Sequence, residues 1–272
     1  MLGLVQGLTE FLPVSSSGHL MIFRELLGAA DTEGFLDFTV AVHFATVLST
    51  IVVFWAAIRD LFKGVFKFTW NDETDYACKL VVSMIPIAIV GVFFKDTVEG
   101  MFSGSLKAVG AGLLITSCLL LLSDNFTRWF GKKGSGGGHE EGGPRNGISW
   151  LQAFIVGIGQ ALAVAPGISR SGTTIATGLI SGVRRSAMAQ FSFLMVLVPI
   201  IGEQSLDILK VALGKESFGA GSGSLALVLG FVAAFLAGLA ACKAMVALVR
   251  RSRLTPFAVY CAFVAILIFI LA

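Results

Sequence analysis

Charged residues are scarce in this sequence of 272 residues. Only 14% are Asp, Glu, Lys or Arg, whereas roughly 25% are charged in an average soluble domain. Hydrophobic residues make up 56% of the chain and its mean hydropathy is +0.86. The 20 Lys and Arg and 17 Asp and Glu could hardly cover a soluble fold of this length. The composition therefore excludes a soluble enzyme, a disordered chain and a fibrous protein, and it indicates an integral membrane protein.

Concentrated positive charge and paired cysteines are also missing. The formal net charge is +3 and the basic residues are scattered between apolar runs, so we expect no binding to nucleic acid. The four cysteines lie singly in apolar stretches, which argues against a disulfide framework or a zinc site. Met1–Gly7 has no basic region and no small-residue cleavage pattern, so we expect no cleaved signal peptide.

Long apolar runs are present. A helix needs about 20 mostly apolar residues to cross a hydrocarbon core of about 30 Å. The segments that meet this requirement are Phe35–Ile58, Cys78–Phe94, Leu106–Leu122, Ala187–Leu209, Leu225–Val249 and Leu254–Leu271. Two others, Leu2–Leu27 and Ile148–Ile180, are interrupted by Pro, Ser and Gly, so each predicts a helix, a polar turn and a second helix. A turn inside the hydrocarbon core predicts a re-entrant hairpin that lines a protected site, because lipid cannot form hydrogen bonds with the free backbone N–H and C=O groups.

The two interrupted segments resemble each other. Gly7–Glu10 aligns with Gly157–Gln160, and Ser15–Gly18 aligns with Ser169–Gly172. Each half of the chain then holds one hairpin and three spanning helices. Because three is odd, the second half enters the membrane from the opposite face. The predicted fold is an all-α polytopic membrane protein with an inverted-topology repeat, six spans and two re-entrant hairpins, and such repeats place their sites near the middle of the bilayer.

The repeat divides a single membrane domain, 1–272, into two parts. The first repeat is 1–130, the second is 148–272, and a flexible Gly-rich loop, 131–147, joins them. If each hairpin returns to the side it entered, 14 of the 20 Lys and Arg residues lie on the side of that loop and five on the side of the termini. By the positive-inside rule the loop is cytoplasmic and both termini lie outside.

Ionisable groups at membrane depth are candidates for function because burying them is costly. Gln6 and Glu10 are four residues apart and therefore share one helix face. Ser16 and His19 follow at the turn and are three residues apart, close enough for a hydroxyl and an imidazole to converge. His43, in the first span, is more typical of a histidine that is hydrogen-bonded in helix packing.

The second hairpin has the composition of an oxyanion site. Pro166–Thr174 contains four hydroxyls, two glycines and Arg170. Ser169 or Ser171 is expected to cap the next helix, whose free N–H groups favour an anion. Arg170 can bind phosphate oxygens in a bidentate manner, so a phosphate or pyrophosphate is the favoured ligand. The alternative is that these small polar residues serve only close helix packing.

Two motifs carry a resemblance to a known family. Gln6–His19 (QGLTEFLPVSSSGH) and Pro166–Thr174 (PGISRSGTT) resemble the signature motifs of the bacterial undecaprenyl-diphosphate phosphatases, the bacitracin-resistance family. The resemblance covers nearly the whole chain, and the main departure is the loop at 131–147. It implies a multi-pass enzyme of the bacterial plasma (inner) membrane that hydrolyses undecaprenyl diphosphate to undecaprenyl phosphate plus phosphate, on the outer (periplasmic) side. This reaction recycles the lipid carrier for peptidoglycan synthesis.

The resemblance also implies roles for individual residues. Ser16 would be the nucleophile, with His19 as its acid/base partner, and whether a phosphoserine forms or water attacks directly stays open. Glu10 would activate the nucleophile or bind a divalent cation, Mg²⁺ or Ca²⁺, together with Gln6, since both ions prefer oxygen ligands. Arg170 would clamp the phosphate. The other residues expected at the substrate phosphates are Ser15, Ser17, Gly18, Gln160, Ser169, Ser171, Gly172, Thr173 and Thr174.

The expected partners are a polyprenyl diphosphate lipid and the bilayer, and the option of a homodimer is left open. A transporter or lipid flippase is the alternative function, because secondary transporters share inverted repeats and broken helices. The Ser16–His19 pair favours the enzyme, since anion transport needs no nucleophile and base. A purely structural scaffold would leave several ionisable groups at membrane depth without a role.

Overall fold

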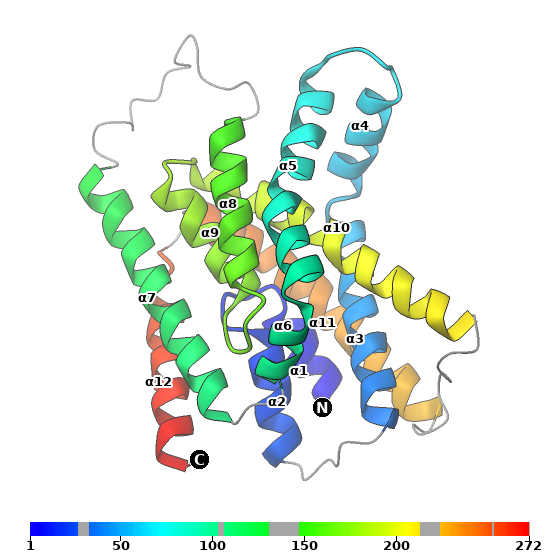
Figure 1. Cartoon of the computed structure of the whole chain (residues 1–272), viewed down its shortest axis with the longest axis vertical. Coiled ribbons are helices and arrows are strands. Elements are labelled where there is room, and N and C mark those ends of the chain that lie inside the picture. The colour runs from blue at the N-terminus through cyan, green and yellow to red at the C-terminus, as the bar shows by residue number, and fades with distance from the viewer. Residues whose placement is uncertain (27–32, 103–105, 131–146, 213–223, 252, 272) are drawn as a thin grey trace.

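The computed structural model describes residues 1–26, 33–102, 106–130, 147–212, 224–251 and 253–271, and within these ranges every regular element is a helix (Figure 1). The elements are α1 (Leu2–Thr9), α2 (Ser16–Leu26), α3 (Glu33–Val53), α4 (Trp55–Val65), α5 (Asp72–Phe93), α6 (Lys95–Phe102), α7 (Leu106–Phe130), α8 (Trp150–Leu162), α9 (Arg170–Ile180), α10 (Arg185–Ala212), α11 (Ser224–Arg251) and α12 (Thr255–Leu271). The predicted all-helical class is confirmed. The predicted Gly-rich loop, 131–147, lies outside the described residues except for Gly147.

Both interrupted segments form a helix, a break and a second helix, as predicted. The first break, residues 10–15, separates α1 from α2, and the second break, residues 163–169, separates α8 from α9. α1 has eight residues and α8 has 13, so at 1.5 Å per residue they are about 12 and 20 Å long. Neither helix is long enough to cross a membrane by itself.

Four of the described helices are long and apolar enough to cross a membrane: α5, α7, α10 and α11. α12 is also apolar but has 17 residues, about 25 Å of helix. The prediction of one continuous span over Phe35–Ile58 is wrong, because α3 and α4 are bent by 74° where they meet. If this bent pair crosses the membrane as one unit, the number of such spans is five.

The bend between α3 and α4 arises from packing. It occurs at Phe54, in a stretch without glycine or proline. The Phe54 ring is buried and lies 5.8 Å from the ring of Phe193 on α10. α4 then packs against α5, where the Asn71 side-chain amide donates to the carbonyl oxygen of Gly64 at 2.9 Å. Contacts on both sides of Phe54 therefore fix the direction of the chain.

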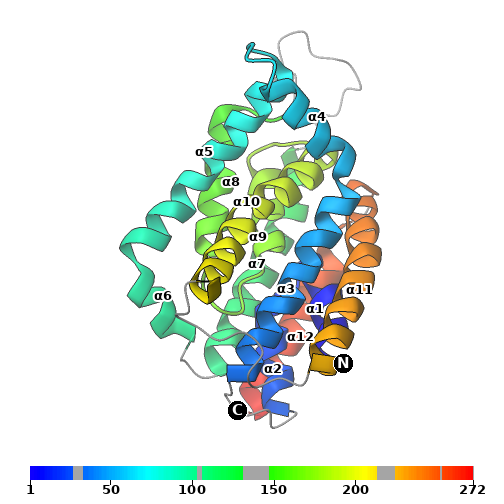
Figure 2. The ribbon, with the colours of Figure 1, turned by 90° about the vertical axis from the view of Figure 1, so that its right-hand side faces the viewer.

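The short helices of each half pack against long helices of the other half. α1 lies along α11 and beside α3 (Figure 2). A Cβ atom on Gly7 would lie 2.5 Å from the carbonyl oxygen of Ala234 on α11. In the same way α8 lies along α5, where a Cβ atom on Gly157 would overlap the carbonyl oxygen of Ser83. Gly7 and Gly157 are the two glycines aligned in the sequence, so the matched positions make equivalent contacts.

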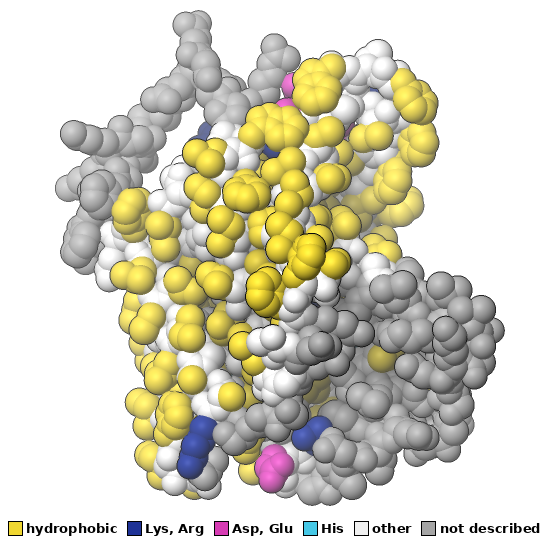
Figure 3. Space-filling view, viewed as in Figure 1, with side chains coloured by type: hydrophobic (Ala, Val, Ile, Leu, Met, Phe, Trp, Pro, Cys, Tyr) yellow, Lys and Arg dark blue, Asp and Glu magenta, His cyan; other side chains and the backbone are white. Residues whose placement is uncertain are grey.

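The outer surface of the helices is apolar. Figure 3 shows hydrophobic side chains over the described part of one face, with Lys, Arg, Asp and Glu only near its two ends. On α5, Val81 is 65% exposed and Val92 is 75% exposed. A wide apolar surface of this kind on a soluble monomer would be unusual. It agrees with several helices that meet lipid, and the protein is a multi-pass membrane protein.

A buried carboxylate joins three helices at one end of the bundle. Asp124 on α7 pairs with Arg185 on α10 at 2.7 Å. Its other oxygen accepts bonds at 2.6 and 2.8 Å from the backbone N–H groups of Leu254 and Thr255, and one at 2.9 Å from the Thr255 hydroxyl. Asp124 therefore caps the start of α12.

Candidate active site

The first break contacts the start of α9 in the interior. The Ser171 hydroxyl donates to the carbonyl oxygen of Leu12 at 3.2 Å. Helix α7 supports the second break, because the backbone N–H of Ser169 donates to the Thr116 hydroxyl at 2.9 Å. Gly167 adopts φ +82° there and fits against the backbone of α7, which a side chain would overlap. Residues far apart in the sequence thus form one polar region.

Each second helix of a hairpin starts with the same side-chain cap. The Ser169 hydroxyl accepts from the backbone N–H of Gly172 at 3.1 Å. The Ser15 hydroxyl accepts from the N–H of Gly18 at 3.3 Å, and Ser15 has a positive φ of 67°. Of the two serines predicted as possible caps of α9, Ser169 is the cap. Ser15 and Ser169, which are aligned in the sequence, thus make the same cap hydrogen bond, although the backbone differs, with φ −75° at Ser169.

Glu10 is the centre of a hydrogen-bonded cluster at the end of α1. Its Oε2 atom accepts from the Gln6 amide at 2.8 Å and from the Ser16 hydroxyl at 2.6 Å. The same oxygen lies 4.0 Å from Nε2 of His43 on α3, and the other ring nitrogen of His43 bonds to the carbonyl oxygen of Thr39 at 2.9 Å. His43 is hydrogen-bonded within α3, as expected of a packing histidine, and its second nitrogen also faces Glu10.

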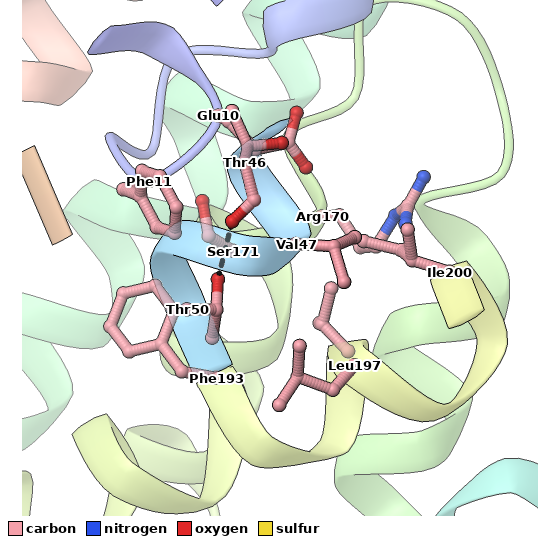
Figure 4. Close-up of a pocket in the computed structure, with 11 residues that line it drawn as sticks. Glu10, Phe11, Thr46, Val47, Thr50, Arg170, Ser171, Phe193, Leu197 and Ile200 are labelled. Atoms are coloured by element: carbon pink, nitrogen blue, oxygen red, sulfur yellow. Dashed lines mark hydrogen bonds between the residues drawn. The ribbon is translucent and has the colours of Figure 1, made fainter. Parts of the chain in front are cut away.

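Glu10 and Arg170 line one pocket (Figure 4). Its polar side chains are Glu10, Thr46, Thr50, Arg170 and Ser171, and its apolar wall comes from Phe11, Val47, Phe193, Val196, Leu197 and Ile200. The cavity volume is about 30 Å³, enough for a water molecule or two but not for a diphosphate. The guanidinium of Arg170 forms no ion pair or side-chain hydrogen bond with any residue that the structure describes. Its charge interacts with the Glu10 carboxylate in the same pocket and is available to an anion that enters it.

His19 does not contact Ser16, contrary to the prediction that the two converge. Nδ1 of His19 bonds to the carbonyl oxygen of Ser15 at 2.8 Å, and Nε2 bonds to the hydroxyl of Tyr260 on α12 at 2.8 Å. The Ser16 hydroxyl instead donates to Glu10. Sequence reasoning missed Tyr260, which is 241 residues from His19, and no local motif marks it.

The remaining predicted phosphate ligands differ in burial and in hydrogen-bond partners. The Thr174 hydroxyl is buried and lies 2.6 Å from the hydroxyl of Ser192 on α10, so its oxygen is occupied within the helix packing. In contrast, Thr173 Oγ1 and both amide atoms of Gln160 are buried without a hydrogen-bond partner among the described residues. Ser17 is half-buried in the first turn of α2. Buried polar atoms without partners are costly, which favours a ligand or water beside Gln160 and Thr173.

A cation at Glu10 would have oxygen ligands. Oε1 of Gln6 is buried and has no hydrogen-bond partner in the described part of the chain, although the amide nitrogen of the same side chain bonds to Glu10. Within the described residues no three His, Cys, Asp or Glu side chains come together as a metal site. Glu10 and Gln6 fit a hard cation such as Mg²⁺ or Ca²⁺ whose other ligands are substrate phosphates and water.

The chain is similar to known proteins over almost its whole length. Residues 1–267 match the family described as Bacitracin resistance protein BacA. The chain is 49% identical to the undecaprenyl-diphosphatase of Bacteroides thetaiotaomicron, covering 99% of this chain and 96% of that protein. It is 50% identical to that of Parabacteroides distasonis, with 96% and 92% covered, and 38% identical to that of Methanococcus vannielii, with 96% and 94% covered. This protein therefore belongs to the Bacitracin resistance protein BacA family.

Proposed function

We propose that this protein is a membrane enzyme that hydrolyses undecaprenyl diphosphate to undecaprenyl phosphate and inorganic phosphate. The relatives that match it end to end are undecaprenyl-diphosphatases. The observation that carries the proposal is the Ser16 hydroxyl bonded to Glu10, a carboxylate that lines one pocket together with Arg170. A hydroxyl paired with a carboxylate is an activated nucleophile, and an unpaired guanidinium binds phosphate.

Ser16 and Glu10 account for the bond-breaking step. The Ser16 oxygen attacks the terminal phosphorus and passes its proton to Glu10, 2.6 Å away. A new O–P bond forms, the bond to the bridging oxygen breaks, and undecaprenyl phosphate leaves. Water then releases phosphate from Ser16. In the alternative, Glu10 takes the proton from a water that attacks directly, and detection of phosphoserine at Ser16 by mass spectrometry separates the two routes.

The second hairpin accounts for binding of the charge. Transfer of a phosphoryl group spreads negative charge over its outer oxygens, and fixed donors stabilise that charge. Arg170 is the first residue of α9, whose N-terminal end carries a partial positive charge. Ser171 lines the same pocket. A divalent cation held by Glu10 and Gln6 would neutralise further phosphate charge. We also propose His19 as an acid/base group for the leaving oxygen or the attacking water and not for Ser16, because its two nitrogens bond to Ser15 and Tyr260.

We infer the inverted repeat of six spans and two re-entrant hairpins as the membrane arrangement. Its support is the pair of matched features: the Ser15 and Ser169 caps, and the close packing of Gly7 and Gly157 on helices of the other half. In this arrangement α3 and α4 form one bent span and α12 is the last one. The loop charge favours an orientation with both termini and the pocket opening on the periplasmic side of the plasma membrane. Impermeant thiol labelling of single-cysteine variants in intact cells tests the orientation.

The apolar side of the pocket faces the part of the substrate that carries the lipid tail. Phe193, Leu197 and Ile200 of α10 form this side. Because the cavity of about 30 Å³ is too small for the headgroup, the helices that line it have to separate when substrate binds. This arrangement lets the diphosphate reach Arg170 while the polyprenyl chain stays in hydrocarbon.

Phosphate release from undecaprenyl diphosphate by the purified protein in detergent tests the proposed function. We expect release from the wild type that stops with chelator, with Arg170→Ala and with Ser16→Ala. Arg59→Ala and Ser181→Ala are matched controls outside the pocket and should keep wild-type rates. Retained activity in both Arg170→Ala and Ser16→Ala would refute the proposed site. Lipid movement in vesicles without any phosphate release would support the transporter instead.

A further inference from the structure

The His19 side chain is held from two sides. His19 is 4% exposed. Both ring nitrogens are hydrogen-bonded at 2.8 Å, one to the carbonyl oxygen of Ser15 and the other to the hydroxyl of Tyr260. The Tyr260 ring also stacks on the imidazole, with 5.7 Å between the ring centroids and 11° between the ring planes. One tyrosine therefore makes a hydrogen bond and a stacking contact with the same side chain.

The hydrogen bonds define the imidazole tautomer. A carbonyl oxygen can only accept, so Nδ1 of His19 carries a hydrogen that it donates to Ser15. In neutral His19, Nε2 is then an acceptor, and the Tyr260 hydroxyl donates to it. In the imidazolium, Nε2 donates and the Tyr260 oxygen accepts. The pair is satisfied in both states, so His19 can gain or release a proton without leaving a buried group unpaired.

We infer that Tyr260 is a positioning residue of the active site, which fixes the orientation and tautomer of His19 through its hydroxyl and its ring. The inference rests on the proposed function only in taking His19 as part of the reaction. Tyr260 lies on α12, the last helix of the chain, and His19 lies on α2 near its start. The second half of the chain thereby completes the acid/base group of the first hairpin.

The alternative is that Tyr260 only fills space between α12 and α2. Tyr260 is 43% exposed, so a large part of its surface is not buried in packing. A space-filling role would tolerate phenylalanine, which keeps the ring and loses the hydroxyl. A positioning role needs the hydroxyl, because nothing else in phenylalanine can bond to Nε2 of His19. Tyr260→Phe separates these roles.

The test measures kcat and KM of phosphate release for Tyr260→Phe and Tyr260→Leu in detergent. We expect kcat to fall about 10-fold in Tyr260→Phe, the effect of one lost hydrogen bond to a reacting group. We expect a larger fall in Tyr260→Leu, where stacking is lost too, and a KM within about twofold of wild type in both. The matched control is Tyr76→Phe, the other tyrosine of the chain, whose ring packs edge-on against Phe191. Its kcat should not change.

A double-variant comparison shows whether Tyr260 acts through His19. In a His19→Gln background, with its lower residual kcat, Tyr260→Phe should cause no further fall. A full 10-fold fall there would show that Tyr260 acts independently of His19 and would overturn the inference. Wild-type kcat in Tyr260→Phe, or in His19→Gln, would overturn it as well. An inactive wild type would instead refute the proposed function, and thermal unfolding of each variant identifies loss of fold.

Discussion

The Glu10 carboxylate offers the sharpest test of the chemistry. Its Oε2 atom is 2.6 Å from the Ser16 hydroxyl, a distance typical of a strong hydrogen bond to an ionised group. Glu10→Gln keeps the size of the side chain but removes the base. General-base catalysis contributes roughly 10²- to 10⁴-fold to a rate, and we expect kcat to fall within that range, about 3 to 5 kcal/mol in the barrier.

Glu10→Asp tests position rather than charge. The shorter side chain withdraws the carboxylate by about 1.5 Å, roughly one C–C bond, so the bond to Ser16 at 2.6 Å cannot be kept without movement of α1 or α2. A displacement of about 1 Å in a catalytic group can cost about 10²-fold in rate. We therefore expect Glu10→Asp to lose most of its activity although it keeps a carboxylate.

The assay is single-turnover phosphate release, so that slow product release does not mask the chemical step. Glu25→Gln, at an exposed position at the end of α2, is the matched control and should keep wild-type activity. Thermal unfolding in detergent checks that each variant is folded. A folded Glu10→Gln variant with kcat within about threefold of wild type would refute the assignment of Glu10 as the base.

Three further predictions concern other parts of the structure. We expect Asp124→Ala to lower the free energy of unfolding by about 2 to 4 kcal/mol, because it removes the ion pair with half-buried Arg185 and the acceptor that caps α12; an unchanged melting temperature in detergent would contradict this. Gly157→Leu should prevent folding, because its side chain would overlap the backbone at Ser83, and a monodisperse, active variant would disprove the close packing of α8 on α5. His43→Ala should lower kcat about 10-fold by removing the nitrogen 4.0 Å from Glu10. Wild-type kinetics in this variant would show that His43 serves only helix packing.

The sequence by itself determined the class of protein and the two hairpins. Helices and breaks depend on local properties: apolar runs of the right length, and Pro, Ser and Gly at 13–18 and 166–172 that interrupt them. The cap at Ser169 follows from its own side chain and the next turn of backbone. Glu10 and Ser16 are only six residues apart, so a sequence motif could identify both as parts of one site.

Only the tertiary structure decided the long-range contacts. The 74° bend at Phe54 has no local signal, because contacts with α10 and α5 produce it. Tyr260 reaches His19 across 241 residues, and His43 faces Glu10 from a different helix. Helical periodicity says which residues share a face, but not which helix that face meets. The partners of His19 and Glu10 depend on helix packing, since their hydrogen bonds form only when distant segments are brought together.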